Sequence, residues 1–172
     1  MLARLALVAL LAIGLPAAHA QKLVTFGHGT TTVLLPSGFI TTELNDGTLR
    51  AVFGKTGENR LEIAIREAAS TTGDANAGEQ FVRAEAKAKG LRVFEYPGRV
   101  AFMQAAPDTR DGDRALRTAL WEVGFGDSVA VLTLVAPAEP TPELSQFLGA
   151  PLTTVVTSVR RKAPASPPSG RP

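Results

Sequence analysis

The most continuous apolar pattern of the chain lies between residues 114 and 137. It predicts two strands joined by a tight turn at 124–127. Both faces of the second strand are apolar, because Val129, Val131 and Val135 alternate with Ala130, Leu132 and Leu134. Such a strand is typical of the middle of a sheet that is covered on both sides. We therefore expect Val131→Asp to unfold the domain, because a covered central strand cannot solvate a charge.

Shorter extended stretches lie on the N-terminal side of this hairpin. They are rich in Thr, Val, Leu and Ile, which favour strands, and turn residues separate them. Leu61, Ile63 and Ile65 alternate with polar residues, as in a strand with one exposed face. The predicted strands cover residues 23–26, 31–35, 39–44, 49–53, 60–66, 91–96 and 99–105, and a polar loop follows at 108–113.

Two segments have helical patterns. Residues 75–89 are rich in Ala, Glu, Lys and Gln, with Asp74 as a candidate N-cap and Gly90 at the end. In the second segment, 144–159, apolar residues recur every three or four positions, and Thr141 precedes it as N-cap. Pro151 lies inside that pattern, so we expect a break near Gly149.

The order of elements is several strands, a helix, four strands and a helix. This order predicts an α+β fold, an antiparallel β-sheet covered by a mid-chain helix and a C-terminal helix. It lacks the strand–helix alternation of a doubly wound fold. We expect one domain over residues 21–162, followed by a disordered Pro-rich tail at 163–172.

The first twenty residues have the pattern of a secretory signal peptide. Arg4 precedes a short apolar run, and Ala18-His19-Ala20 matches a cleavage site. The run is too short to span a membrane, so we expect no stable membrane insertion after cleavage. The chain has no cysteine, which excludes disulfides and the usual bacterial lipoprotein anchor. We therefore expect a periplasmic or secreted protein.

The charges are nearly balanced. The chain has 18 basic and 16 acidic residues, and one of the basic residues, Arg4, leaves with the signal peptide. So small an excess gives no field to attract nucleic acid or an anionic membrane.

The layout resembles the PsbP-like superfamily, which includes the DcrB-like bacterial exported proteins. The resemblance covers roughly residues 30–161 and rests on the stretch Leu34-Leu35-Pro36-Ser37-Gly38-Phe39, the helix at 75–89, the long hairpin with Trp121 and the closing helix. Phe39 stands where that family usually has Trp. The family has no shared catalytic residues, and its members mostly bind or assist other proteins. The resemblance therefore implies an accessory or binding role.

Residues for familiar catalytic or metal chemistry are few. His28 is the only histidine after the signal peptide. Ser128 lies in a Gly-Asp-Ser-Val-Ala stretch that lacks the second glycine and the helix of a nucleophile elbow. Asp108, Asp111 and Asp113 are the candidate metal ligands, although their spacing is not that of an EF-hand and a solvated loop is the favoured interpretation. No motif for a cofactor is present.

The candidate binding residues are Trp121, Phe125, Arg160 and Arg161. The two aromatic residues share one strand face, where they form either the core or the floor of a ligand pocket. The two arginines form either a docking patch or the charged end of the closing helix. Our leading hypothesis is an exported, non-enzymatic protein of the bacterial envelope that binds a protein partner. The alternatives are a periplasmic small-molecule binder with a pocket under the C-terminal helix, and a cryptic acid–base hydrolase.

Overall fold

The computed structural model describes residues 20–54, 60–70 and 74–162. Residues 1–19 of the predicted signal peptide and the Pro-rich tail lie outside these residues. The elements in chain order are β1 (Gln21–Phe26), β2 (Thr31–Pro36), β3 (Ile40–Glu43), β4 (Leu49–Phe53), β5 (Leu61–Ser70), α1 (Ala77–Ala88), β6 (Val93–Tyr96), β7 (Arg99–Asp111), β8 (Arg114–Phe125), β9 (Ser128–Pro137), α2 (Pro142–Ser145), α3 (Ala150–Ser158) and β10 (Arg160–Arg161).

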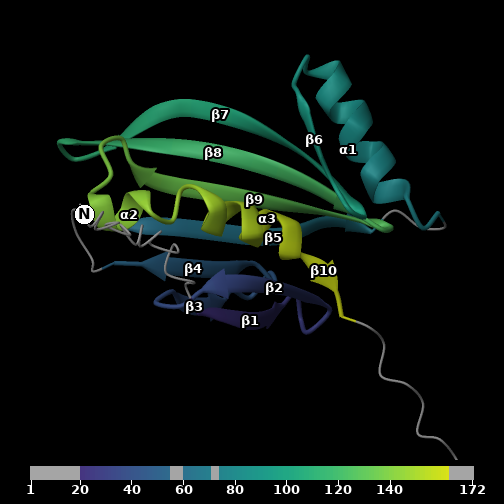
Figure 1. Cartoon of the computed structure of the whole chain (residues 1–172), viewed down its shortest axis with the longest axis horizontal. Coiled ribbons are helices and arrows are strands. Elements are labelled where there is room, and N and C mark those ends of the chain that lie inside the picture. Colours follow the sequence, from purple (N-terminus) through teal and green to yellow (C-terminus); the bar gives the residue numbers. More distant parts are fainter. Residues whose placement is uncertain (1–19, 55–59, 71–73, 163–172) are drawn as a thin grey trace, which may run out of the picture.

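The strands form two antiparallel sheets rather than one. The larger sheet has seven strands in the order β3-β4-β5-β9-β8-β7-β6, and the smaller has the order β1-β2-β10. Helices α2 and α3 lie between the two sheets in Figure 1, and α1 lies at the far end of the larger sheet. The predicted antiparallel α+β fold is confirmed, and the division into two sheets is new.

Strand β9 is the central strand of the larger sheet, as its apolar sequence predicted. Its neighbours are β5 and β8. One face, with Ala130, Leu132 and Leu134, is buried. On the other face Val129 is buried beneath α1, whereas Val131 and Val135 are partly exposed. The expectation that both faces are covered is therefore wrong, because α1 covers only one end of the outer face. Since Val131 is partly exposed, the reason given for expecting Val131→Asp to unfold the domain is wrong too.

The main core fills the space between the two sheets. Phe26 and Leu35 reach into it from the smaller sheet, Ile65 and Leu132 from the larger sheet, and Val156 from α3. All five side chains are almost fully buried. Burial of this apolar area is the main source of stability, since the chain has no disulfide.

Helix α1 packs on the outer face of the larger sheet and forms a second, smaller core with Phe102 and Val129. A close backbone approach fixes its position, because a side chain at either Gly78 or Gly124 would collide with the facing backbone. The residue before α1 is Asn76, not the predicted cap Asp74. The carboxylate of Asp74 accepts a hydrogen bond from the Asn76 N–H instead.

The C-terminal segment breaks where Pro151 predicted. Helix α2 begins after Thr141, whose hydroxyl accepts a hydrogen bond from the Leu144 N–H at 3.4 Å, and α3 begins after Gly149. The helix ends at Ser158, so Arg160 and Arg161 do not belong to a helical last turn. They form the short strand β10, which pairs with β2 and completes the smaller sheet.

The hairpin of β7 and β8 is longer than the sequence suggested. Strand β7 continues to Asp111, so the predicted polar loop at 108–113 is mostly strand. A bulge between Ala106 and Thr109 accommodates Pro107 within the ladder. No helix within the described residues is long and apolar enough to cross a membrane.

Candidate functional site

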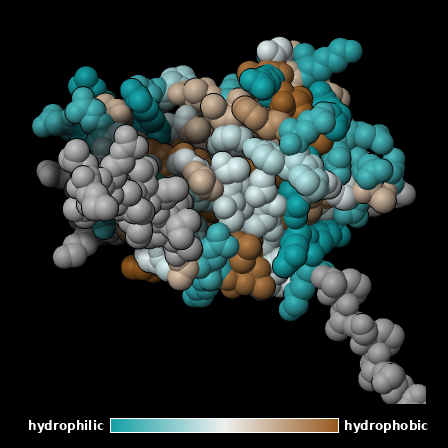
Figure 2. Space-filling model, viewed as in Figure 1, coloured by the Kyte–Doolittle hydropathy of each residue, from teal (hydrophilic) through white to brown (hydrophobic). Residues whose placement is uncertain are grey.

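An open apolar groove lies on the inner face of the larger sheet, beneath the closing helices. Its volume is about 410 Å³. Ala105 and Ala119 form much of its floor, Met103 lies at one end, and Leu148 and Leu152 form the opposite wall. Apolar surface is visible between the pale surface of α3 and the strands above it in Figure 2.

Small side chains keep this groove open. Ala105, Ala119 and Leu134 are in register across β7, β8 and β9, so their side chains point to the same face. Alanine methyl groups do not reach the helix, whereas leucine or phenylalanine would fill the space. Leu148 and Leu152 are therefore only partly buried, although the neighbouring Val155 and Val156 are completely buried.

The predicted aromatic residues lie beside the groove rather than in its floor. Trp121 is in register with Met103 and stacks on Phe94, with ring centroids 5.7 Å apart. It is partly exposed, so it remains a candidate contact for a ligand or partner. Phe125 is 5% exposed and belongs to the main core. Core packing is thus sufficient to explain Phe125.

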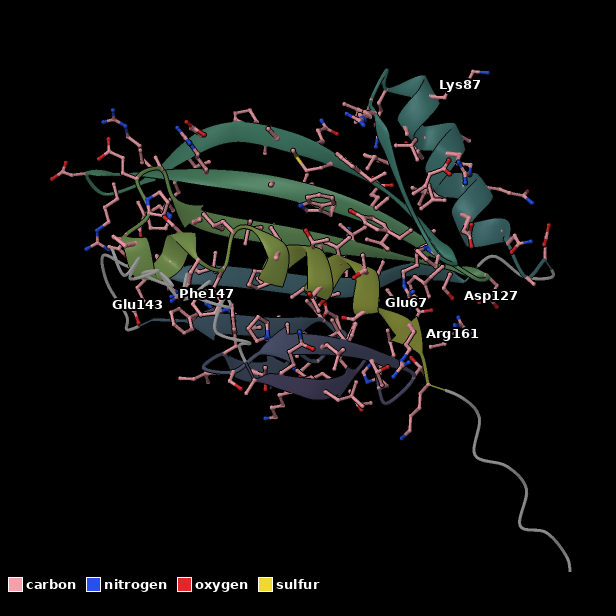
Figure 3. All side chains as sticks on the ribbon, viewed as in Figure 1. Glu67, Lys87, Asp127, Glu143, Phe147 and Arg161 are labelled. Atoms are coloured by element: carbon pink, nitrogen blue, oxygen red, sulfur yellow. The ribbon has the colours of Figure 1, made fainter. Side chains whose placement is uncertain are left out.

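Arg160 and Arg161 lie at the other end of α3. Arg161 forms ion pairs with Glu67 (2.8 Å) and Asp127 (3.6 Å), and the three side chains meet where β10 ends in Figure 3. Glu67 also accepts a hydrogen bond from the Thr31 hydroxyl at 2.8 Å. These contacts join β5 of the larger sheet to the smaller sheet. Arg160 is exposed, and its role as a partner contact stays a prediction.

The electrostatics of Glu67 fit this structural role. Burial disfavours its charged form, but hydrogen bonds from Thr31 and Arg161 and the Arg161 charge outweigh burial and lower the pKa of Glu67. Nearby, the partly buried Arg99 side chain donates a hydrogen bond to the Val159 carbonyl at 3.0 Å, and this partial burial lowers the pKa of Arg99. Hydrogen bonds and ion pairs therefore stabilise the end of the molecule around β10.

The three candidate metal ligands do not gather at one place. Asp108 lines the apolar groove, whereas Asp111 lines a hollow on the opposite face of the sheet, and Asp113 lines neither. Among the described residues, no group of three His, Cys, Asp or Glu side chains is arranged to hold a metal ion. The loop interpretation is wrong for Asp108 and Asp111, which belong to β7, and correct for Asp113 in the turn that follows; all three residues are exposed to solvent as expected.

The hollow on the opposite face has a volume of about 450 Å³ and a charged lining. Glu62 and Arg60 form an ion pair within it. Glu62 also accepts hydrogen bonds from Arg50, which lower the pKa of Glu62 more than burial raises it. A carboxyl group that is paired and charged at neutral pH is poorly suited to act as a general acid.

A lowered pKa is also found at the other shifted carboxyl groups of the described chain. The carboxyl groups with a shifted pKa are Asp46, Glu62 and Glu67, and all three shift downward. A hydrogen bond from the Thr48 N–H is the main cause at Asp46. Catalytic carboxyl groups are often recognised by a raised pKa in a cleft. The described residues give no support of this kind to the hydrolase alternative.

A scan against protein-family models and a search of curated proteins found no match. Solved structures do resemble the chain. A Bacteroides thetaiotaomicron protein has a TM-score of 0.55 and 12% identity, over 83% of this chain and 48% of that protein. The chain thus spans about half the length of that relative. The Ran-binding protein Mog1p of Saccharomyces cerevisiae has a TM-score of 0.51 and 14% identity, over 83% of this chain and 96% of Mog1p.

A cyanobacterial PsbP from Synechocystis also matches, with 15% identity over 88% of this chain and 96% of that protein, and a TM-score of 0.32. The PsbP-like layout predicted from the sequence is confirmed as a likeness of fold. At identities of 12 and 14%, the Bacteroides protein and Mog1p establish the fold alone.

The sequence did not predict which residues line the groove. The sequence predicts a pocket under the C-terminal helix, with the aromatic residues Trp121 and Phe125 in its floor. The available signal was alanine four residues apart on one face of two neighbouring strands, Ala101 and Ala105 in one and Ala115 and Ala119 in the other. Alanine is depleted in strands. Its recurrence on one strand face therefore favours either close packing or an open surface.

Proposed function

We propose that this chain is an exported, non-enzymatic binding protein that holds an apolar element of a partner protein in the groove beneath α2 and α3. The single observation that carries the proposal is the groove itself, a mainly apolar hollow that is open to solvent beside the main core. Exposed apolar surface of this kind is typical of binding sites. The proposal includes neither a cofactor nor a metal.

Three further observations support the proposal. The first twenty residues have the pattern of a signal peptide, which supports export to the periplasm or out of the cell. The carboxyl groups with a shifted pKa are paired and charged rather than poised for acid catalysis. Mog1p, which has the same fold, is a protein that binds another protein.

A second candidate function uses the same groove. Its volume of about 410 Å³ lies within the range of roughly 300–1,000 Å³ that is typical of small-molecule sites. Trp121 at its margin offers an aromatic surface for a ligand. The groove is open to solvent, however, whereas small-molecule sites enclose most of the ligand surface, so the groove suits a segment of a larger partner better.

The proposal is tested by purifying the exported chain gently from its own envelope and recording native mass spectra. Ala105→Trp fills the groove, and Gln104→Trp adds the same side chain to the opposite face of the same strand. We expect a bound protein on the wild type and on Gln104→Trp but not on Ala105→Trp. A small added mass with the same dependence would instead favour the second candidate. Equal binding by all three proteins would contradict a role for the groove.

A further inference from the structure

The outer edge of β7 has no neighbouring strand along most of its length. Strand β7 has 13 residues, and β8 pairs with it along its inner side as far as Asp111. On its outer side β6 pairs only with residues 99–102. Beyond Phe102 no other strand in the described chain pairs with β7 on that side. Figure 1 shows β6 beside one end of β7 only.

The register indicates which backbone groups face this open edge. The hairpin of β6 and β7 closes with Tyr96 opposite Arg99, across the two-residue turn at Pro97 and Gly98. Alternation along an antiparallel ladder then directs the N–H and C=O groups of every second residue, including Met103 and Ala105, away from β8. These two residues therefore present two donors and two acceptors at the spacing of a strand.

The open edge and the apolar groove are adjacent. Met103 and Ala105 line the groove with their side chains and form the open edge with their backbones. Met103 is 38% exposed. A strand laid along this edge would place every second side chain on the groove face, next to the space left by Ala105 and Ala119 and opposite Leu152.

We propose that an extended segment of the partner protein adds as a further strand to the outer edge of β7 at residues 103–106. Backbone hydrogen bonds hold the segment, and its apolar side chains, at alternate positions, enter the groove. This is recognition by strand addition, in which the backbone supplies affinity and the pockets supply specificity. The inference rests on the proposed function and names the kind of partner element that the groove takes.

A second copy of the chain is a poorer occupant of this edge. Symmetric pairing centred on Gln104 would bring the partner copy against β6 of the first after three residues. Pairing shifted toward Asp108 would place Pro107, which has no N–H, and the bulge at 106–109 inside the new ladder. Proline and bulges on an edge are common protection against self-pairing. A segment of another protein meets neither obstacle in the short stretch 103–106.

The test uses the absence of cysteine from the chain. Asp108→Cys supplies one attachment point beside the groove, to which a six-residue peptide of alternating Val and Thr is joined through a glycine linker. Tethering gives an effective peptide concentration on the order of millimolar. Amide hydrogen exchange of the exported chain is then followed residue by residue with NMR. The Gln104 amide, which faces β8, serves as the internal control.

We expect exchange of the Met103 and Ala105 amides to slow by about tenfold or more with the peptide attached, while Gln104 is unchanged. Two N-methylated peptides provide matched controls. In an antiparallel strand the Val amides face β7, so N-methylation at Val abolishes the protection and N-methylation at Thr preserves it. Both peptides have the same composition, so a difference between them reports the backbone ladder.

Three results would overturn the inference: no protection with any peptide, equal protection by both N-methylated peptides, or protection that exists without a peptide and falls on dilution, which would assign the edge to a second copy. Other results would contradict the proposed function, so the two proposals can be distinguished. If strand addition is wrong but the groove binds a partner, Ala105→Trp still removes the bound protein. If the groove binds nothing, no bound protein is present on the wild type.

Discussion

The two flanks of the closing helices are built differently. On one flank Phe147 packs against Phe39 and Phe53, with ring centroids 5.8 and 4.3 Å away, and seals the helices onto β4. On the other flank the next residue, Leu148, faces alanines across an open groove. The adjacent residues Phe147 and Leu148 thus have different roles. The closed flank attaches the helices, and the open flank leaves apolar surface free to bind.

The largest expected difference between the flanks is in stability. Phe147 is 4% exposed, so Phe147→Ala should lower the free energy of unfolding by about 3–5 kcal/mol. Leu148 is partly exposed, so Leu148→Ala should lower it by no more than about 1 kcal/mol. Urea unfolding followed by Trp121 fluorescence measures both. Equal losses would mean that the groove flank is packed as tightly as the aromatic flank.

Two alanines on β7 allow the packed core and the open groove to be compared within one strand. Ala101 and Ala105 point to the same face of β7, but Ala101 is 0% exposed whereas Ala105 is exposed. Ala101→Leu should destabilise the domain by about 1–3 kcal/mol because it overpacks the core. Ala105→Leu should change stability by less than about 0.5 kcal/mol. Thermal unfolding of both variants checks this, and a large loss from Ala105→Leu would contradict an open groove.

The polar contacts around Glu67 should affect stability without affecting binding. Glu67→Gln weakens hydrogen bonds to Thr31 and Arg161, at an expected cost of about 1–3 kcal/mol. The folded-state pKa of Glu67 lies below its ordinary value of 4.5. Its contribution to stability is therefore present above pH 4.5 and is lost as the pH falls through the folded-state pKa.

Unfolding curves recorded from pH 7 down to pH 3 test this assignment. The difference in stability between the wild type and Glu67→Gln should shrink as the medium becomes acidic. A difference that stays constant with pH would show that the charge of Glu67 contributes nothing. Binding in the groove should be the same for both proteins, because Glu67 lies at the other end of α3.

The smallest effect is expected at Arg160. Its side chain is exposed on a two-residue strand, whereas the neighbouring Arg161 is paired with Glu67. Arg160→Gln should change stability by less than about 0.5 kcal/mol, and Arg161→Gln should cost more. Chemical denaturation of the two variants distinguishes them. A larger loss from Arg160→Gln would reverse the roles assigned to the two arginines.

The sequence predicted local structure better than it predicted the site. The alternation of Leu61, Ile63 and Ile65 identified a half-buried strand, and Pro151 located the break in the closing segment, because these signals depend on neighbours in the chain. The separation of β1 and β2 from the main sheet depends on pairing with β10, which is about 130 residues away. Periodicity carries no information about such pairing.

The groove was missed for a related reason. An alternating strand shows which residues share a face but not what covers that face. Trp121 and Phe125 share a face, yet the main core covers Phe125 and leaves Trp121 partly exposed. Whether an alanine such as Ala105 packs closely or leaves a hollow depends on the course of α2 and α3, which only the folded chain shows.

The most direct test of the groove as a binding site is photo-crosslinking in the envelope of the producing cell. A benzophenone amino acid replaces Ala105, which faces the groove, or Lys87, which is exposed on α1 away from the groove. We expect a discrete protein adduct from position 105 and none from position 87. An adduct from position 87 alone, or the same adduct from both positions, would contradict the claim that the partner lies in the groove.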